Sequence, residues 1–99
     1  MARFDVHVNR GGSGYLLDVQ ADLISGLNTR LVVPLLPVDI APASAARLNP
    51  VFEVQGERVS MATQFMAAVP LAELGAPVAN LDPQSDAIFA AIDFVHHGW

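Results

Sequence analysis

The sequence predicts one mainly β domain that ends in an α-helix. Short segments of alternating apolar and polar residues occupy most of the chain, whereas apolar residues follow helical spacing after position 83. A length of 99 residues suits a single domain, and no repeat, linker or low-complexity tract divides the chain. Because 53% of the residues are hydrophobic and 15% are charged, we expect a folded protein with some apolar surface facing another chain.

A β-hairpin and a buried strand are expected first. Residues 4–8 (FDVHV) alternate in polarity, and residues 15–20 (YLLDVQ) are expected to return beside them after the glycine-rich connection 11–14. The apolar run 30–36 (RLVVPLL) is too short to cross a membrane and fits a buried strand. Pro34 within that run predicts a bulge or a bend.

A second hairpin and an edge strand follow. Residues 51–55 and 58–63 flank a turn expected at 56–57. The strand expected over 66–71 contains Pro70, which cannot donate to a neighbouring strand, so we place it at an edge or end it there.

The helical predictions concern two regions. The alanine-rich segment 39–48 favours a short helical turn. The terminal helix is expected over 84–97, with Asp82 as its N-cap, Pro83 at its first position and Gly98 at its end. Its apolar face comprises Ala87, Ile88, Ala91, Ile92, Phe94 and Val95. Its opposite arc comprises Asp86, Phe89, Asp93 and His97.

The charge balance excludes several kinds of function. The net charge is −5, and all five basic residues are arginines. Without a basic stripe we expect no nucleic-acid binding by this chain alone. The lack of lysine excludes a Walker-A loop and Schiff-base chemistry, and the lack of cysteine excludes disulfides and thiol nucleophiles. Residues 1–5 show no apolar signal region and no apolar run approaches about 18 residues, so we expect a soluble cytoplasmic protein without membrane contact.

Catalytic and metal-binding patterns are weak. His96 and His97 are adjacent, and neighbouring helix positions point about 100° apart, so we interpret them as a solvated helix end rather than a metal site. The glycines at 11–14 lack the strand-to-helix context of a dinucleotide site. Asp18 and Asp22 are not expected to meet as an acid/base pair. We therefore predict no enzyme, no cofactor and no metal.

Two aromatic residues stand in unusual places. Phe89 lies on the polar arc of the expected helix, and Trp99 follows Gly98. Two interpretations remain open. Both residues pack against their own barrel or a second subunit, or they are exposed anchors that enter a partner's pocket.

Four blocks resemble one protein family. Residues 18–24 (DVQADLI) resemble the D-V-Q-[SA]-D-[IL]-[IL] segment of the CcdB family, which comprises the toxins of CcdA–CcdB toxin–antitoxin modules. Residues 30–35 (RLVVPL) are similar to that family's R-x-V-I-P-L strand, and 61–70 to its methionine-containing strand that ends in S-V-P. Residues 87–98 are similar to its terminal helix and penultimate glycine.

The resemblance implies an SH3-like antiparallel β-barrel of the CcdB/MazF type with a carboxyl-terminal helix. It also implies a homodimer whose terminal helices lie close together. Such a toxin binds the A subunit of DNA gyrase and traps the enzyme on cleaved DNA. A CcdA-like antitoxin neutralises it, and toxin and antitoxin together repress their operon, with the antitoxin contacting DNA.

The resemblance also implies the gyrase-binding residues, which are Leu23, Ile24, Asp93, His96, His97, Gly98 and Trp99. Asp93 stands where the family has asparagine, and His97 stands at the tryptophan of the family's F-W-G-I tail. These departures allow a gyrase from another lineage, a weakened poison, or Trp99 as the new aromatic anchor. We favour Trp99 as the anchor, because interface hot spots are enriched in tryptophan.

Two alternative functions remain. The first is a MazF-like endoribonuclease, which needs cationic and acid/base groups around the scissile phosphate. Such ribonucleases carry an R-G-D-like start to an early strand, whereas this chain has Arg10-Gly11-Gly12 and few basic residues. A degenerate homologue would bind the antitoxin without poisoning gyrase.

Overall fold

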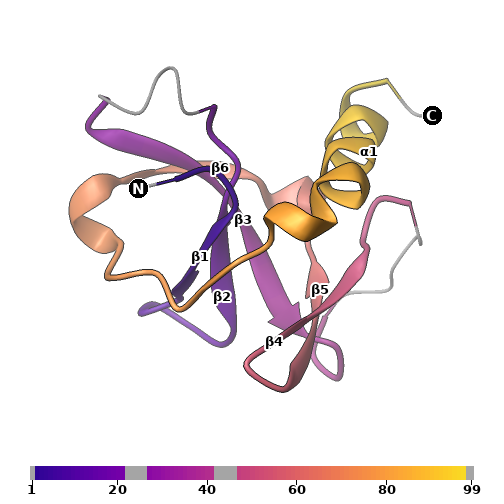
Figure 1. Ribbon diagram of the computed structural model, residues 1–99, viewed down its shortest axis with the longest axis horizontal. Helices are drawn as coiled ribbons and strands as arrows, with labels where there is room; N and C mark the ends of the chain where they lie inside the picture. Colours follow the sequence, from indigo (N-terminus) through magenta and orange to yellow (C-terminus); the bar gives the residue numbers. More distant parts are fainter. Residues whose placement is uncertain (1, 22–26, 42–46, 98–99) are drawn as a thin grey trace.

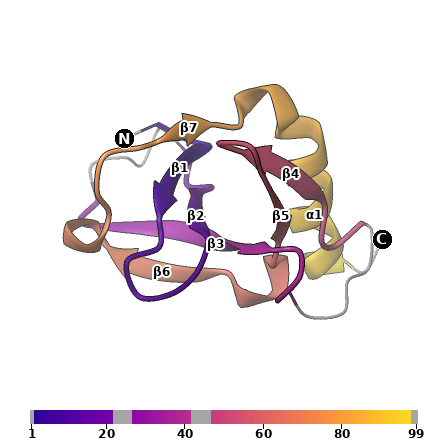
Figure 2. The same ribbon diagram turned by 90° about the horizontal axis from the view of Figure 1, so that it is seen from below.

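The computed structural model describes residues 2–21, 27–41 and 47–97, and in these ranges seven antiparallel strands form one curled sheet (Figure 1). The strands are β1 (Asp5–Val8), β2 (Tyr15–Asp18), β3 (Thr29–Pro37), β4 (Val51–Val54), β5 (Glu57–Met61), β6 (Ala67–Pro70) and β7 (Ala79–Asn80). Their order is β4-β5-β3-β2-β1-β7, and β6 pairs with β3. Viewed from below, the strands form a ring (Figure 2). The predicted fold class, a barrel-like antiparallel sheet with a carboxyl-terminal helix, is confirmed.

Three short 3-10 helices and one α-helix complete the described part of the chain. They are η2 (Thr63–Phe65), η3 (Leu71–Glu73), η4 (Asp82–Gln84) and α1 (Ser85–His97). None of these helices combines the length and the apolar character that a membrane crossing requires. The helical turn expected over 39–48 falls largely on 42–46, outside the described residues.

Strand β3 changes its outer neighbour at Pro34. The register with β6 ends at Val32, and the register with β5 begins at Leu35. The Pro34 carbonyl accepts the N–H of Ala62 at 2.9 Å, so the missing proline N–H lies at the gap between the two partners. The register with β2 continues through Pro34 without interruption, so this pairing contains no bulge, and the alternative of a bend stays a prediction.

The predicted first hairpin is confirmed, and Gly14 explains its close approach to β3. Val8 pairs with Tyr15 across the loop. Gly14 has a φ of 81°, and a Cβ added there would lie 2.1 Å from the carbonyl oxygen of Leu35. Only glycine meets both conditions.

The second hairpin turns one residue earlier than predicted. Gln55 and Gly56 have φ values of 52° and 82°, and Val54 pairs with Glu57. Two consecutive left-handed residues make the tight turn that fits the twist of a β-hairpin. The predicted position of the turn, at residues 56–57, was therefore wrong, although the two strands were predicted correctly.

The helix begins differently from the prediction. Asp82 is part of η4 and makes no side-chain cap, so the N-cap assignment was wrong. The backbone N–H of Asp82 donates a hydrogen bond to Oδ1 of Asn80 at 2.8 Å. The α-helix then starts at Ser85 and runs to His97, close to the predicted end.

Two layers of side chains lie on the two faces of the sheet. The main core packs α1 against one face through Ile88 and Ala91. It includes Phe4, Val6, Leu17, Val33, Leu35, Phe52, Val54, Val59, Met61 and Leu81. Because side chains alternate along a strand, neighbouring positions point to the other face. That second layer holds the buried polar residues His7, Asp18 and Arg30.

Candidate functional site

Three of the residues that the sequence predicts for the site are described by the structure, and they lie in the carboxyl-terminal half of α1. Asp93, His96 and His97 are all exposed there, and the two imidazole ring centroids lie 6.5 Å apart. Leu23, Ile24, Gly98 and Trp99 lie outside the described residues. The helix therefore offers three of the seven predicted residues to solvent on its last turns.

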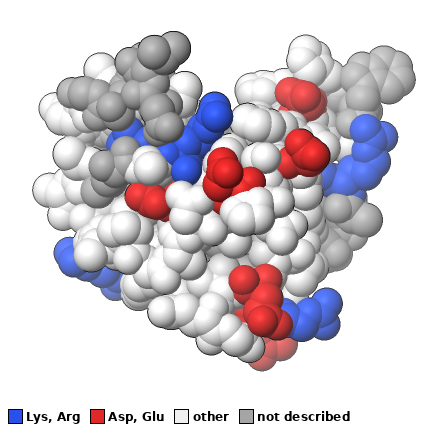
Figure 3. Space-filling view, in the orientation of Figure 1, with Lys and Arg blue, Asp and Glu red and all other residues white. Residues whose placement is uncertain are grey.

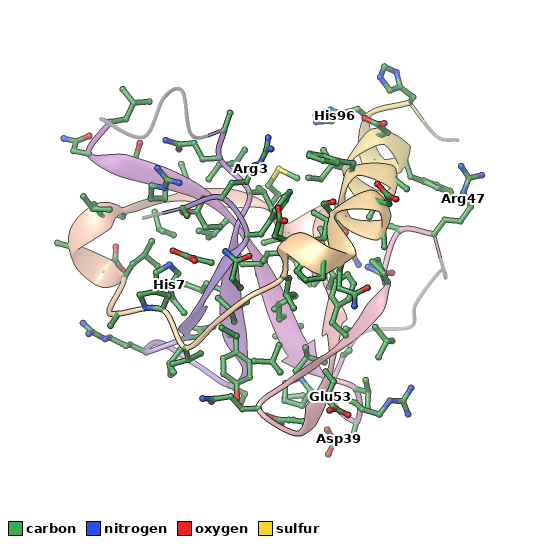
Figure 4. The ribbon with its side chains drawn as sticks, viewed as in Figure 1. Arg3, His7, Asp39, Arg47, Glu53 and His96 are labelled. Carbon is green, nitrogen blue, oxygen red and sulfur yellow. The ribbon has the colours of Figure 1, made fainter. Side chains whose placement is uncertain are left out.

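A cavity of about 380 Å³ opens beside this half of the helix. Its lining residues are Arg47, Ala90, Asp93 and His97. Asp93 and His97 are four positions apart and so share one helix face. Arg47, which the sequence analysis missed, comes from the segment before β4, and its guanidinium carbon lies 5.0 Å from the ring centroid of Phe94 (Figure 4). This cation–π contact sets Arg47 against the helix.

The described lining of this cavity combines three polar side chains with one small apolar side chain. A guanidinium, a carboxylate and an imidazole surround the small side chain of Ala90, and none of these four lining residues is a serine, threonine or cysteine. In the described ranges, no three His, Cys, Asp or Glu side chains are placed to hold a metal ion. Such a mixture of charged and apolar groups fits polar recognition of a partner surface.

A second group of side chains lies where the amino-terminal turn meets α1. Phe4 is 1% exposed, and its ring makes an edge contact with the ring of Phe89 at 5.4 Å. The Arg3 guanidinium carbon lies 5.0 Å from the Phe4 centroid and 5.2 Å from the Phe89 centroid. Phe89 is still 43% exposed, so it both packs against its own barrel and contributes apolar surface.

Phe4 adopts an unusual backbone conformation at this place. Its φ of 72° is in the left-handed region, which is rare for a bulky residue. The Phe4 N–H donates to the Asp18 carbonyl at 2.6 Å, and the Phe4 carbonyl accepts the N–H of Leu81 at 2.9 Å. These bonds hold the strained residue between β2 and the start of the helical segment, and so orient Arg3 towards Phe89.

Charges on this face are mixed. Figure 3 shows acidic groups over α1 and a basic group beside it, with no continuous basic patch on the face in view. The acidic residues of α1 are Asp86 and Asp93. This distribution favours a protein partner over a nucleic-acid backbone on this face.

The D-V-Q motif forms a buried network at the exit of β2. Oδ2 of Asp18 accepts the Nε–H of Arg30 at 2.7 Å, and Nη2 of Arg30 lies 2.7 Å from the same oxygen. The contact of Nη2 with the carboxylate is an ion pair. Oδ1 accepts the N–H of Gln20 at 3.0 Å, and Oε1 of Gln20 accepts the N–H of Leu31 at 3.1 Å.

This network explains the sequence motif in structural terms. Asp18, Gln20 and Arg30 are all buried, and together they tie the end of β2 to the start of β3. The Asp18 carboxylate is in contact with Arg30. Asp22 lies outside the described residues, so the expected separation of Asp18 and Asp22 stays a prediction. In the sequence, Asp18 and Gln20 of this network directly precede the segment that carries Leu23 and Ile24.

Comparison with known protein families supplies the last observation. The family model described as "CcdB protein" matches residues 3–98. This match includes the buried D-V-Q network, the β3 strand with Pro34 and the whole of α1. Since it covers nearly the entire chain, this protein belongs to the CcdB family, and that membership implies the role of toxin in a toxin–antitoxin module.

Proposed function

We propose that this protein is a non-catalytic poison of DNA gyrase, which binds the gyrase A subunit and traps the enzyme on cleaved DNA. The family match over residues 3–98 carries this proposal. The exposed Asp93, His96 and His97 support it, because they occupy the helix end at which the family's gyrase-contact residues are expected.

In this proposal the end of α1 and the residues after it enter the gyrase surface. Arg47 and His97 are available as donors, and Asp93 as an acceptor, around the 380 Å³ cavity. Trp99 supplies the aromatic anchor in place of the family's tryptophan, and Leu23 and Ile24 supply a further apolar pair to the gyrase contact. Removal of an anchor of this kind costs about 2 kcal/mol or more of binding free energy.

A homodimer is part of the proposal. Phe65 of η2 is 53% exposed and Val95 of α1 is 39% exposed, although the sequence pattern places Val95 on the apolar face of the helix. The helix packs against η2 in the monomer. Apolar side chains left open on two contacting elements support their burial by a second copy.

The antitoxin is the remaining partner in this proposal. We propose that a CcdA-like antitoxin neutralises this chain and contacts the operator DNA when the two proteins repress their operon together. A net charge of −5 without any lysine supports this division of roles, because DNA contact requires cationic groups.

The test is cleavage of supercoiled plasmid by gyrase with ATP, with and without this protein. Linear DNA that appears only after protease treatment, and only when both proteins are present, is the expected result. RNA degradation without any topoisomerase would instead support the ribonuclease. Antitoxin binding without cleavage or growth arrest would support the degenerate homologue.

A truncated variant tests the anchor. Deletion of Gly98 and Trp99 is expected to abolish plasmid cleavage and growth arrest while the dimer stays folded. Trp99→Phe is the matched variant, since it keeps an aromatic ring and should retain part of the activity. If the truncated protein still arrests growth, Trp99 is not the anchor.

A further inference from the structure

A second cavity lies far from the end of α1 and has no part in the proposed gyrase contact. It measures about 370 Å³ and lies between the β1–β2 loop and η3, which are at the lower left and the left of Figure 1. Its lining residues are Asn9, Arg10, Gly11, Leu16, Val69, Ala72 and Glu73. The volume falls in the range of small-molecule sites, roughly 300–1,000 Å³.

The cavity has apolar walls from three elements. Leu16 of β2 and Val69 of β6 are both half-buried, and Ala72 of η3 adds a methyl group. Leu16 is next to Leu17, which lies in the main core, so the alternation of side chains places Leu16 on the opposite face of the sheet. An apolar side chain of modest size can be buried there.

Two opposite charges stand at this cavity without neutralising each other. Arg10 comes from the β1–β2 loop and Glu73 from η3. In the described part of the chain, neither residue forms a hydrogen bond or an ion pair; Asp18 and Arg30 make the one ion pair found there. A guanidinium and a carboxylate that share one cavity but do not pair are free to hold two opposite charges of one ligand.

The side chain of Arg10 lies over Gly75. A Cβ added to Gly75 would lie 2.6 Å from Nη2 of Arg10, so the guanidinium rests directly on this glycine. The Gly75 carbonyl accepts a hydrogen bond of 2.8 Å from Nδ1 of His7, which is fully buried. On the loop side, Oδ1 of Asn9 accepts the N–H of Gly11 at 3.1 Å.

We propose that this cavity binds a small zwitterion with an apolar side chain, such as a free apolar amino acid or a dipeptide of such residues. The ligand carboxylate pairs with Arg10, its ammonium pairs with Glu73, and its side chain lies on Leu16 and Val69. This proposal is independent of gyrase binding, because among the described residues none lines both this cavity and the cavity beside α1.

The experiment is a titration of the full chain followed by amide chemical shifts. Leucine and leucyl-leucine are the probes, and the tighter of the two identifies the ligand as a free amino acid or a dipeptide. N-acetyl-leucine lacks the ammonium and leucinamide lacks the carboxylate, so each is expected to bind at least about tenfold more weakly than leucine. Shifts should gather on the amides of residues 9–11 and 71–75.

Variants separate the site from general effects. Arg10→Gln and Glu73→Gln are each expected to weaken binding at least about tenfold. Gly75→Ala should do the same, because its methyl group displaces the guanidinium. The matched controls Arg58→Gln and Glu53→Gln remove the same charges from the exposed β4–β5 hairpin and should leave the affinity unchanged.

Several results would overturn the proposal. These are the lack of saturable shifts with either probe, equal affinity for leucine and its two blocked forms, or equal losses in the site and control variants. The amide spectrum of each free variant shows whether it remains folded. Plasmid cleavage by gyrase is expected to be unchanged in Arg10→Gln, so failure of one proposal leaves the other intact.

Discussion

Two arginines of this protein stand near an aspartate, and their surroundings differ completely. Arg30 and Asp18 are both 0% exposed and lie in ion-pair contact within the sheet. Arg47 and Asp93 line an open cavity at the end of α1 and form no ion pair in the described residues. Figure 4 shows Arg47 beside the helix with its end directed outward.

The difference separates a structural from a binding role for the same two residue types. A buried pair must satisfy its own charges, because water cannot do so, and its partners are therefore unavailable to a ligand. Exposed charged groups that do not pair, such as Arg47 and Asp93, remain hydrated and can exchange water for a partner's groups. Burial, rather than residue type, thus assigns Asp18 to the fold and leaves Asp93 accessible for the recognition that we propose.

The largest expected effect comes from breaking the buried pair. Asp18→Ala leaves the Arg30 charge uncompensated inside the protein, which should lower the free energy of unfolding by about 3–5 kcal/mol. Urea denaturation measures this loss. Asp93→Ala is the matched exposed variant and should change stability by less than about 0.5 kcal/mol. Similar losses for the two variants would contradict the distinction.

A double replacement tests whether the unpaired charge of Arg30 causes this loss of stability. Asp18→Leu combined with Arg30→Met removes both charges and keeps apolar volume, so it should be more stable than Asp18→Ala by about 2 kcal/mol or more. The comparison again uses the urea midpoint. If the double variant is as unstable as Asp18→Ala, the hydrogen bonds around Gln20 matter more than the unpaired charge.

An intermediate loss of stability is expected at Phe89, where the amino-terminal turn meets α1. Phe89→Ala removes a ring that is 43% exposed but contacts Phe4 and Arg3, and should cost about 1 kcal/mol of stability. Thermal unfolding followed by circular dichroism measures it. Phe65→Ala is a suitable control because Phe65 is more exposed, at 53%, and should cost less in a monomer. An equal or larger loss for Phe65 would indicate that a second copy covers it.

A small loss of stability is expected for the exposed Arg47. Arg47→Ala should change the free energy of unfolding by no more than about 1 kcal/mol, the value of an exposed cation–π contact. If the cavity faces gyrase as proposed, this variant should need about tenfold more protein for equal plasmid cleavage. Arg58→Ala removes an equivalent exposed charge on β5 and should need no more than the unchanged protein.

Local pattern was enough to predict most elements of the fold. Alternation located the paired strands, and helical spacing located α1 to within a residue at each end. The errors arose where a contact distant in sequence or a neighbouring side chain intervened. Asn80 satisfies the N–H of Asp82 and η4 precedes the helix, so Asp82 does not act as the cap that its sequence position suggests.

The site was predicted less completely than the fold. Asp93 and His97 could be placed on one exposed arc because helix periodicity alone decides it. Arg47 could not be predicted, because it reaches α1 from an irregular segment without periodicity. The pairing of Asp18 with Arg30 likewise depends on the register of β2 and β3, which the sequence pattern does not specify.

The change of partner along β3 also bears on how the protein folds. The two hairpins close over short loops, whereas β3 must meet β6 from a distant part of the chain. Closing a longer loop costs more entropy, and non-local pairing slows folding. We therefore expect the β3–β6 pairing to form late, and the amide protons of β6 to exchange with solvent sooner than those at the centre of β3.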